Sequence, residues 1–140
     1  MSWIFYAIGS AFFAALVAIF GKVGLTHVDS TLATTIRSLF MAGFLVLISF
    51  VFGKFAFTGS IDSKALTFIV LSGVAGALSW LCYFLALRYG PTTAVAAIDR
   101  TSVVIVLVLA VLFLGEPLRW QSALGALFVV GGAILISTVH

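Results

Sequence analysis

The chain has 140 residues, of which 64% are apolar and only 8% are charged. A water-soluble domain needs roughly a quarter of its residues charged to cover its surface, so this composition excludes that class. The net charge of +3 is dispersed over seven basic residues without forming a tract, and we expect no nucleic-acid partner. Lipid is the solvent that suits such a chain, on condition that the backbone pairs its own polar groups.

Metal, cofactor and enzymatic chemistry are not supported by any motif. Cys82 is the single cysteine, so it cannot form an internal disulfide. His27 and His140 are too far apart in sequence to predict a metal site, and no Cys/His cluster or phosphate-binding loop accompanies them. No Lys or Arg precedes the first apolar run, and the chain stays apolar after it, which argues against a cleaved signal peptide.

Five apolar runs are long enough to cross a bilayer, which takes about 20 residues in a helix. They cover about residues 3–24, 31–52, 65–88, 92–114 and 121–139, with the longest connection at 53–64. The helix-ending sequences Tyr89-Gly90-Pro91 and Gly115-Glu116-Pro117 separate the last three runs. The pattern predicts an all-α integral membrane protein with one domain over 1–140, a multi-pass protein of the cell (plasma or inner) membrane.

An odd number of spans places the two termini on opposite faces of the membrane. The connections on the N-terminal face carry Lys54, Lys64 and Arg119, and the C-terminal face has Lys22 and Arg88 near its boundary. The positive-inside rule needs a clear excess of Lys and Arg on one side, which is missing here. Either weak signals orient the protein, or copies insert both ways round with dual topology.

Asp99 and Arg100 are the most informative pair in the sequence. They follow Pro91 by eight and nine residues, which places them roughly 12–14 Å from the C-terminal face at 1.5 Å per residue. A lone charge near the midplane costs about 3 kcal/mol or more. Because neighbouring helix positions point about 100° apart, the two side chains cannot fully satisfy each other and each needs another partner.

Two basic residues on earlier spans lie at a depth where they could supply that partner. Arg37 lies about seven residues into the second span and could meet Asp99, and Lys22 approaches the same face from the first span. Ser102 is three residues after Asp99, on the same side of a continuous helix. The cluster is either a buried polar network that sets helix register or a polar site in a water-filled cavity. The excess of positive charge would suit an anionic or zwitterionic substrate.

The aromatic residues Trp80 and Tyr83 lie well inside the third span, too deep to act as interfacial anchors. One interpretation is that they fill space between helices. The other is that they line a cavity, because each ring combines an apolar body with a hydrogen-bond donor.

Several short runs resemble the EamA family of the drug/metabolite transporter superfamily, in its single-repeat form. They are SAFFAAL at 10–16, FGK at 20–22, VDS at 28–30, LATTIR at 32–37, ALRYG at 86–90, AIDRTS at 97–102 and LGE at 114–116. Many relatives have Pro where this chain has Ala97 and Lys where it has Arg100. The second change keeps the charge, and the first removes a kink that bears on gating.

The resemblance implies a ten-helix transporter built from two five-helix repeats in inverted topology, of the kind that exports amino acids or other metabolites. A chain of 140 residues holds one such repeat. The complete transporter would then be an antiparallel homodimer, or a pair with a paralogous half. Inverted repeats that meet at a midplane site are a recurring basis for alternating access.

We therefore expect a secondary transporter, an exporter of a small polar metabolite or amino acid, acting as a dual-topology homodimer in the lipid bilayer. The expected pathway residues are Lys22, Arg37, Asp99 and Arg100, lined by Trp80, Tyr83 and Ser102. Asp99 is the candidate for proton coupling, because burial raises and neighbouring cations lower the pKa of a carboxylate. Two alternatives remain open: a flippase for lipids or lipid-linked carriers, and a non-transporting membrane subunit whose polar cluster binds a partner.

Overall fold

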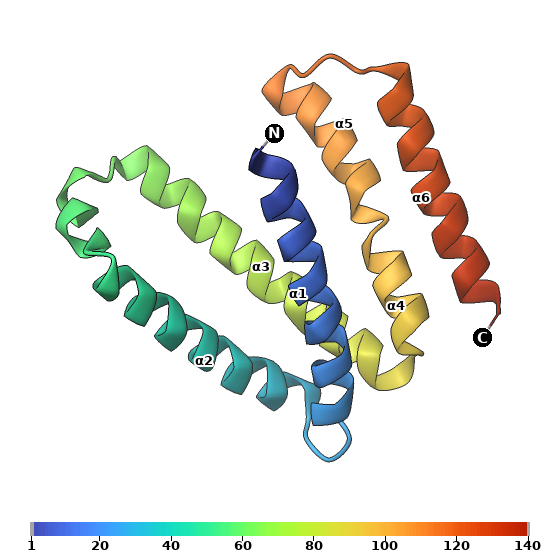
Figure 1. The fold of residues 1–140 in the computed structure, drawn as a ribbon, viewed down its shortest axis with the longest axis horizontal. Coiled ribbons are helices and arrows are strands. Elements are labelled where there is room, and N and C mark those ends of the chain that lie inside the picture. Colours follow the sequence, from blue (N-terminus) through green and yellow to red (C-terminus); the bar gives the residue numbers. More distant parts are fainter. Residues whose placement is uncertain (1, 140) are drawn as a thin grey trace. The chain divides into compact units, whose positions relative to one another are not determined.

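The computed structural model describes residues 2–139, with the side chains of Ser2, Phe57, Thr58 and Ser60 left out. Met1 and His140 lie outside the described residues, and so does the interpretation of His140 given above. The elements are α1 (Ser2–Gly24), α2 (Ser30–Val51), the 3₁₀ helix η1 (Lys54–Ser60), α3 (Ser63–Tyr89), α4 (Thr92–Asp99), α5 (Ser102–Leu114) and α6 (Trp120–Thr138) (Figure 1).

The predicted fold class is confirmed, because the described chain is helical and contains five segments long and apolar enough to cross a membrane. These segments are Trp3–Gly24, Ser30–Val51, Ser63–Tyr89, Thr92–Leu114 and Trp120–Thr138. The connection expected at 53–64 is partly ordered as η1, which begins after Gly53 in a left-handed conformation with φ 63°. A side chain is disfavoured at that φ, which explains the glycine.

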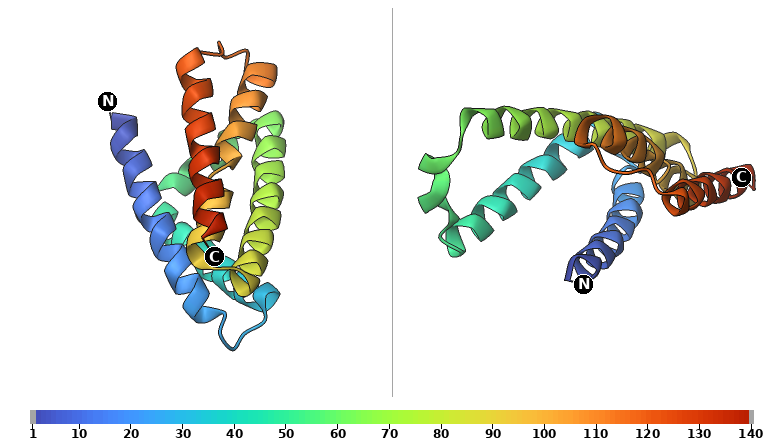
Figure 2. Two further views of the ribbon diagram at one scale, coloured as in Figure 1. Left: turned by 90° about the vertical axis from the view of Figure 1, so that its right-hand side faces the viewer. Right: turned by 90° about the horizontal axis from the view of Figure 1, so that it is seen from above.

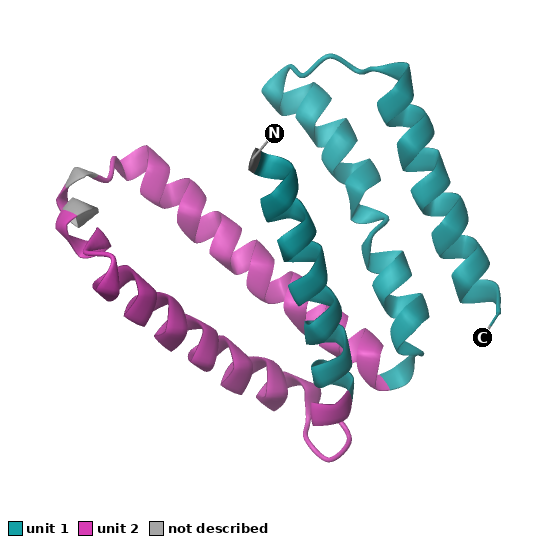
Figure 3. Cartoon of the chain, viewed as in Figure 1, with its two compact units in different colours: residues 1–22, 89–140 teal, residues 23–88 magenta. Residues whose placement is uncertain are grey.

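The chain divides into two compact units, shown in different colours in Figure 3. Unit 1 comprises Met1–Lys22 and Tyr89–His140, and unit 2 comprises Val23–Arg88. Each is described below by itself. The interpretation of residues 1–140 as one domain stays a prediction.

Unit 1 contains most of α1 together with α4, α5 and α6. The α6 helix runs beside α4 and α5, as the views of Figures 1 and 2 agree. The ammonium of Lys22 donates a hydrogen bond to the carbonyl oxygen of Gly90 at 2.9 Å, which ties the end of α1 to the residues before α4. The α5 helix stops at Gly115, where φ is 66° and the amide of Glu116 bonds the carbonyl of Ala110 at 3.2 Å. This is the glycine-terminated helix end that the sequence predicted.

Unit 2 contains α2 and α3, which η1 connects. Asp29 caps the start of α2, because its Oδ1 accepts hydrogen bonds from the amides of Thr31 at 2.8 Å and Leu32 at 3.3 Å. Its Oδ2 lies 3.3 Å from the Arg88 guanidinium, so one carboxylate joins the beginning of α2 to the end of α3. The amide of Leu32, then that of Thr31, and to a smaller extent Arg88 hold the pKa of Asp29 below its ordinary value of 3.8.

The cap at Asp29 generates a prediction about pH. A lowered pKa in the folded state means that the carboxylate stabilises the protein above pH 3.8 and loses this effect as the pH falls through the folded value. We expect the unfolding temperature in detergent to drop as the pH is lowered from about 5 to below that value. Asp29→Asn should flatten this drop, because the amide still caps the helix but does not titrate.

The matched control for this experiment is Asp62→Asn, which replaces the other loop aspartate of unit 2. Circular dichroism at a series of pH values would measure both variants. A drop in unfolding temperature that is equally steep in Asp29→Asn and in the unmodified chain would contradict the assignment.

Candidate functional site

The seven residues expected to form the site are divided between the two units. Unit 1 holds Lys22, Asp99, Arg100 and Ser102, and unit 2 holds Arg37, Trp80 and Tyr83. In unit 2 the structure brings Arg37 against Trp80, which contacts Tyr83. In unit 1 Asp99, Arg100 and Ser102 lie within one turn of the chain, and Lys22 contacts Gly90 instead. The pairing of Arg37, in unit 2, with Asp99, in unit 1, stays a prediction.

The fourth span is interrupted where its charged residues lie. Asp99 is the last residue of α4 and Ser102 is the first of α5, with Arg100 and Thr101 forming a turn between the two helices. Both turn residues have ψ −14°, against about −42° in an α-helix, which is the geometry of a tighter 3₁₀ turn. A span expected to run unbroken from Thr92 to Leu114 is thus made of two helices.

The turn shifts the backbone hydrogen bonds by one residue. The amide of Thr101 bonds the carbonyl of Ile98 at 2.9 Å, and the amide of Val103 bonds that of Arg100 at 3.2 Å. In a continuous α-helix these amides would bond the carbonyls of Ala97 and Asp99. Those two carbonyls therefore lose their ordinary helical donors. Inside a membrane, backbone groups freed in this way are tolerated where they face protein or line a water-filled cavity.

The Thr101 side chain supports the turn. Its hydroxyl donates to the carbonyl of Ile98 at 2.7 Å, the same oxygen that accepts from the Thr101 amide. Serine and threonine bonds of this kind compete with the helical pattern and bend helices. The sequence indicated the loss of a kink, because Ala97 stands where many relatives have Pro. The pair Thr101-Ser102 was overlooked, although it is the signal that could have located the break.

Within the described part of unit 1, Asp99 and Arg100 form no ion pair, either with each other or with a neighbour. The Asp99 side chain is half-buried, and that of Arg100 is exposed. The interruption thus presents one carboxylate, one guanidinium and displaced peptide groups at one level of the membrane. Groups of this kind at a discontinuous membrane helix are suited to contact a polar solute. No group of three His, Cys, Asp or Glu side chains among residues 2–139 could hold a metal ion.

Lys22 has a structural contact that the sequence did not predict. Its hydrogen bond to the Gly90 carbonyl occupies the ammonium at the turn between α3 and α4. A cation near the ends of helices is stabilised by carbonyl oxygens there. A role for Lys22 in the transport pathway stays a prediction.

In unit 2, Arg37 of α2 lies against an aromatic cluster on α3. Its Cζ is 3.6 Å from the centroid of the Trp80 ring and 5.5 Å from that of Phe84. Tyr83 meets the Trp80 ring edge-on, with centroids 5.6 Å apart. Contact with these two rings stabilises the positive charge of Arg37 inside the membrane span through cation–π interactions. Phe84 was overlooked from the sequence, although it lies four residues after Trp80 and therefore on the same helix face.

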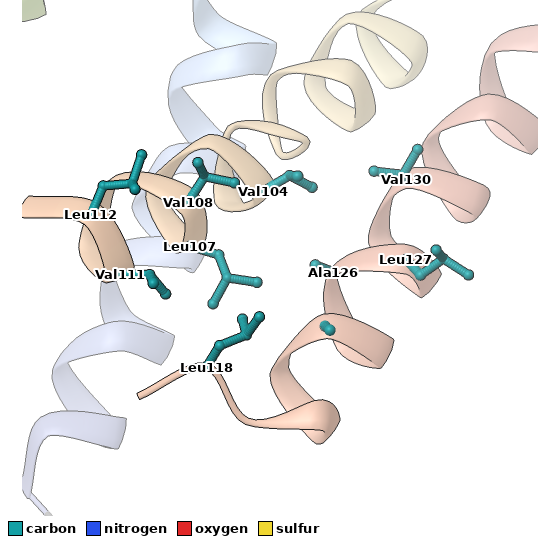
Figure 4. Close-up of a pocket in the computed structure, with 10 residues that line it drawn as sticks. Val104, Leu107, Val108, Val111, Leu112, Leu118, Ala126, Leu127 and Val130 are labelled. Atoms are coloured by element: carbon teal, nitrogen blue, oxygen red, sulfur yellow. The ribbon is translucent and has the colours of Figure 1, made fainter. Parts of the chain in front are cut away.

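A groove of about 470 Å³ lies between α5 and α6 in unit 1 (Figure 4). All of its lining side chains are apolar, so none of them offers a hydrogen bond to a polar solute. The groove therefore differs in chemistry from the polar turn at Arg100. The lining residues are Val104, Leu107, Val108, Val111, Leu112, Leu118, Ala123, Ala126, Leu127 and Val130.

Comparison with known proteins places this geometry in context. The model of the EamA-like transporter family matches residues 1–138. The chain is 40% identical over 136 residues to a protein of Sinorhizobium sp named "Uncharacterized transporter in cobO 3'region". That alignment covers 97% of this chain and 96% of the relative. No solved structure matches the chain.

The interruption of the fourth span can be tested through Thr101→Val. Loss of the hydroxyl removes one hydrogen bond that favours the turn, worth about 1 kcal/mol. The ratio of continuous helix to turn at this place should therefore rise about five-fold. We expect amide hydrogen exchange at residues 100–103 to slow by about that factor. Thr35→Val is the matched control, because the Thr35 hydroxyl makes a similar bond, 2.9 Å to Thr31, inside the unbroken α2 helix. Unchanged exchange at residues 100–103 would show that Thr101 does not maintain the turn.

Proposed function

Because this chain belongs to the EamA-like transporter family, we propose that it is a secondary transporter that exports a small polar metabolite or amino acid as an antiparallel homodimer. It is a multi-pass protein of the cell membrane, and its family consists of transporters. The proposal adds the class of substrate, the direction of transport and the arrangement of the dimer.

The observation that carries the proposal is the interrupted fourth span. Transporters that bind solutes near the midplane commonly do so at discontinuous helices, because displaced peptide groups there replace the hydration shell of the solute. In this chain the interruption coincides with Asp99 and Arg100, the two charged residues placed deepest in unit 1. These charged side chains and displaced peptide groups favour a polar solute over an apolar one.

Asp99 is our candidate for the group that couples transport to protons. A half-buried carboxylate at a break between two helices changes its surroundings when the helices move, as a coupling group must. The interruption supports this role, because a tighter turn within a helix often marks a hinge. Movement of α4 relative to α5 would then change the environment of the carboxylate.

The dimer arrangement follows from span number and charge balance. Five spans put the termini on opposite faces, so two repeats joined end to end would have opposite orientations, and an unfused chain needs a second copy inserted the other way. The basic residues of the connections are divided almost evenly between the faces, which permits such insertion. A paralogous half of opposite orientation is the alternative partner.

One observation favours a lipid or lipid-linked carrier as a second candidate substrate. The apolar groove between α5 and α6 has the chemistry to accept an acyl or prenyl chain. Movement of a fluorescent lipid between leaflets of proteoliposomes, with no transport of amino acids, would support this candidate over the polar solute.

Replacing Asp99 with Asn tests the coupling role. The amide keeps the shape of the side chain but cannot carry a proton, so we expect pH-gradient-driven transport to fall by about ten-fold or more while the fold is retained. Proteoliposomes containing the pH dye pyranine would report proton movement on addition of each of the common amino acids. Asp62→Asn, outside the spans, is the matched control and should keep its activity. Full proton-coupled transport by Asp99→Asn would overturn the coupling role.

The orientation of the C-terminus tests the antiparallel dimer. Fusions to a reporter active only in the cytoplasm and to one active only outside should both give substantial signal. Lys54→Ala together with Lys64→Ala should increase the cytoplasmic signal, because it leaves the C-terminal face richer in basic residues. Lys22→Ala with Arg88→Ala should have the opposite effect. A signal from one side alone in the unmodified chain would rule out the antiparallel homodimer.

A further inference from the structure

Arg37 is held in an unusual way for a cation inside a membrane span. Arg37 lies seven residues after the first residue of α2, roughly 10 Å from the start of that helix at 1.5 Å per residue. Its Cζ lies 3.6 Å from the centroid of the Trp80 ring and 5.5 Å from that of Phe84, and both rings belong to α3. The side chain therefore crosses from one helix of unit 2 to the other, and an aromatic surface fixes its guanidinium.

The contact with Trp80 uses the face of the guanidinium. A separation of 3.6 Å from the ring centroid is a stacking distance, and a guanidinium is planar with five N–H donors that point outward in its plane. Stacking consumes none of these donors. The edge of the group is consequently left in the orientation that two parallel hydrogen bonds to a planar acceptor require.

The aromatic cluster itself is built to keep this orientation. Trp80 and Phe84 are four residues apart on one face of α3, with ring centroids 5.9 Å apart. Tyr83 contacts both rings, at 5.6 Å from Trp80 and 6.3 Å from Phe84. Phe84 is 3% exposed, so the half-buried Trp80 ring packs against a buried neighbour.

Unit 2 provides no carboxylate for Arg37 at this depth. The sequences of α2 and α3 contain neither Asp nor Glu. Asp29, just before α2, is engaged by two backbone amides and by Arg88. Asp62 precedes α3 at the opposite end of that helix. An arginine cannot escape its charge by losing a proton, so the aromatic rings stabilise it only in part.

We propose that the edge of Arg37, fixed by stacking on Trp80, is the receptor for a carboxylate group of the transported solute. This inference rests on the proposed transport function and names the class of its substrate. A bidentate pair of a carboxylate with a guanidinium combines two charge-assisted hydrogen bonds and fixes the direction of the bound group. Trp80 and Tyr83, expected above to line the pathway, become the elements that position this receptor.

The observations favour a carboxylate over a phosphate group. Arg37 is the single cation within α2, and the cations of α3, Lys64 and Arg88, stand at its two ends. One guanidinium matches the charge of one carboxylate, whereas a phosphate dianion needs a second cation for balance. The depth of Arg37 also places the receptor inside the hydrocarbon region, away from the phosphates of lipid headgroups.

The test is a binding measurement on the purified full-length protein in detergent. Trp3→Phe with Trp120→Phe leaves Trp80 as the single tryptophan, and both replaced side chains are exposed, at 71% and 68%. Acetate, succinate and glycine are titrated against acetamide, succinamide and glycinamide, which share their shapes but lack a carboxylate. We expect the carboxylates to change the Trp80 emission saturably and the amides to leave it unchanged.

Variants of Arg37 separate recognition from folding. Arg37→Gln should abolish the response. Arg37→Lys keeps the charge but loses the planar fork, so we expect the affinity to weaken about ten-fold or more. Lys64→Gln removes a cation at the other end of α3, outside the cluster, and should leave the response as it is in the unmodified chain. Far-ultraviolet circular dichroism checks that each variant keeps its helices.

Three results would overturn the inference: an equal response to the amides, a response retained in Arg37→Gln, or a response to inorganic phosphate without one to carboxylates. Proteoliposome assays distinguish this failure from failure of the proposed function. Proton-coupled transport of solutes that lack a carboxylate would leave the transporter standing and remove the receptor. A carboxylate-dependent change in Trp80 emission, with no transport of any tested solute, would leave the receptor standing and remove the transporter.

Discussion

In the hydrocarbon of a bilayer, a peptide group that loses its hydrogen-bond partner cannot turn to water, and each such group costs several kcal/mol. This constraint explains why the spans of this chain are helical. It also makes the turn at Arg100 and Thr101 informative, because there the fourth span departs from the α-helical hydrogen-bond pattern. Around the turn between Asp99 and Ser102 the amides of Thr101, Val103 and Val104 bond carbonyls one residue closer than an α-helix requires. The carbonyls of Ala97 and Asp99 thereby lose their usual donors. A bilayer tolerates this arrangement only beside protein or water, so the interruption is the structural basis of the proposed site.

The charged residues of the chain are stabilised by different means according to depth. Asp29 and Arg88, at the membrane boundary, form an ion pair that also caps a helix. Arg37, deeper in α2, rests on the rings of Trp80 and Phe84 instead. Asp99 stands at the end of α4 without an ion pair in the described part of its unit. Among these described residues the ion pair lies outside the apolar core of the spans, and the charge within α2 is stabilised by aromatic rings instead.

The family explains why an isolated repeat would carry an incomplete set of these groups. In a transporter made of inverted repeats, the site forms where the two repeats meet, so each repeat contributes part of it. On the proposed function, the polar groups of unit 1 and the arginine–aromatic cluster of unit 2 would be the contribution of this chain. The relative from Sinorhizobium sp aligns over nearly its whole length, so a chain of this size recurs in the family.

The sequence by itself determined the solvent, the number of membrane-spanning segments and the family. Runs of about 20 apolar residues allow no other spanning structure than a helix, and Gly115 shows that helix ends too follow from local chemistry. It also identified the charged residues within the spans as candidates for the site, because a charge inside a membrane is costly and must be stabilised. Only the tertiary structure decided what these residues contact: Lys22 with the Gly90 carbonyl, Arg37 with Trp80 and Phe84, and Thr101 with the Ile98 carbonyl. Helix formation depends on near neighbours in the chain, whereas these contacts depend on which face each helix presents and on competition between side-chain and backbone donors for one oxygen.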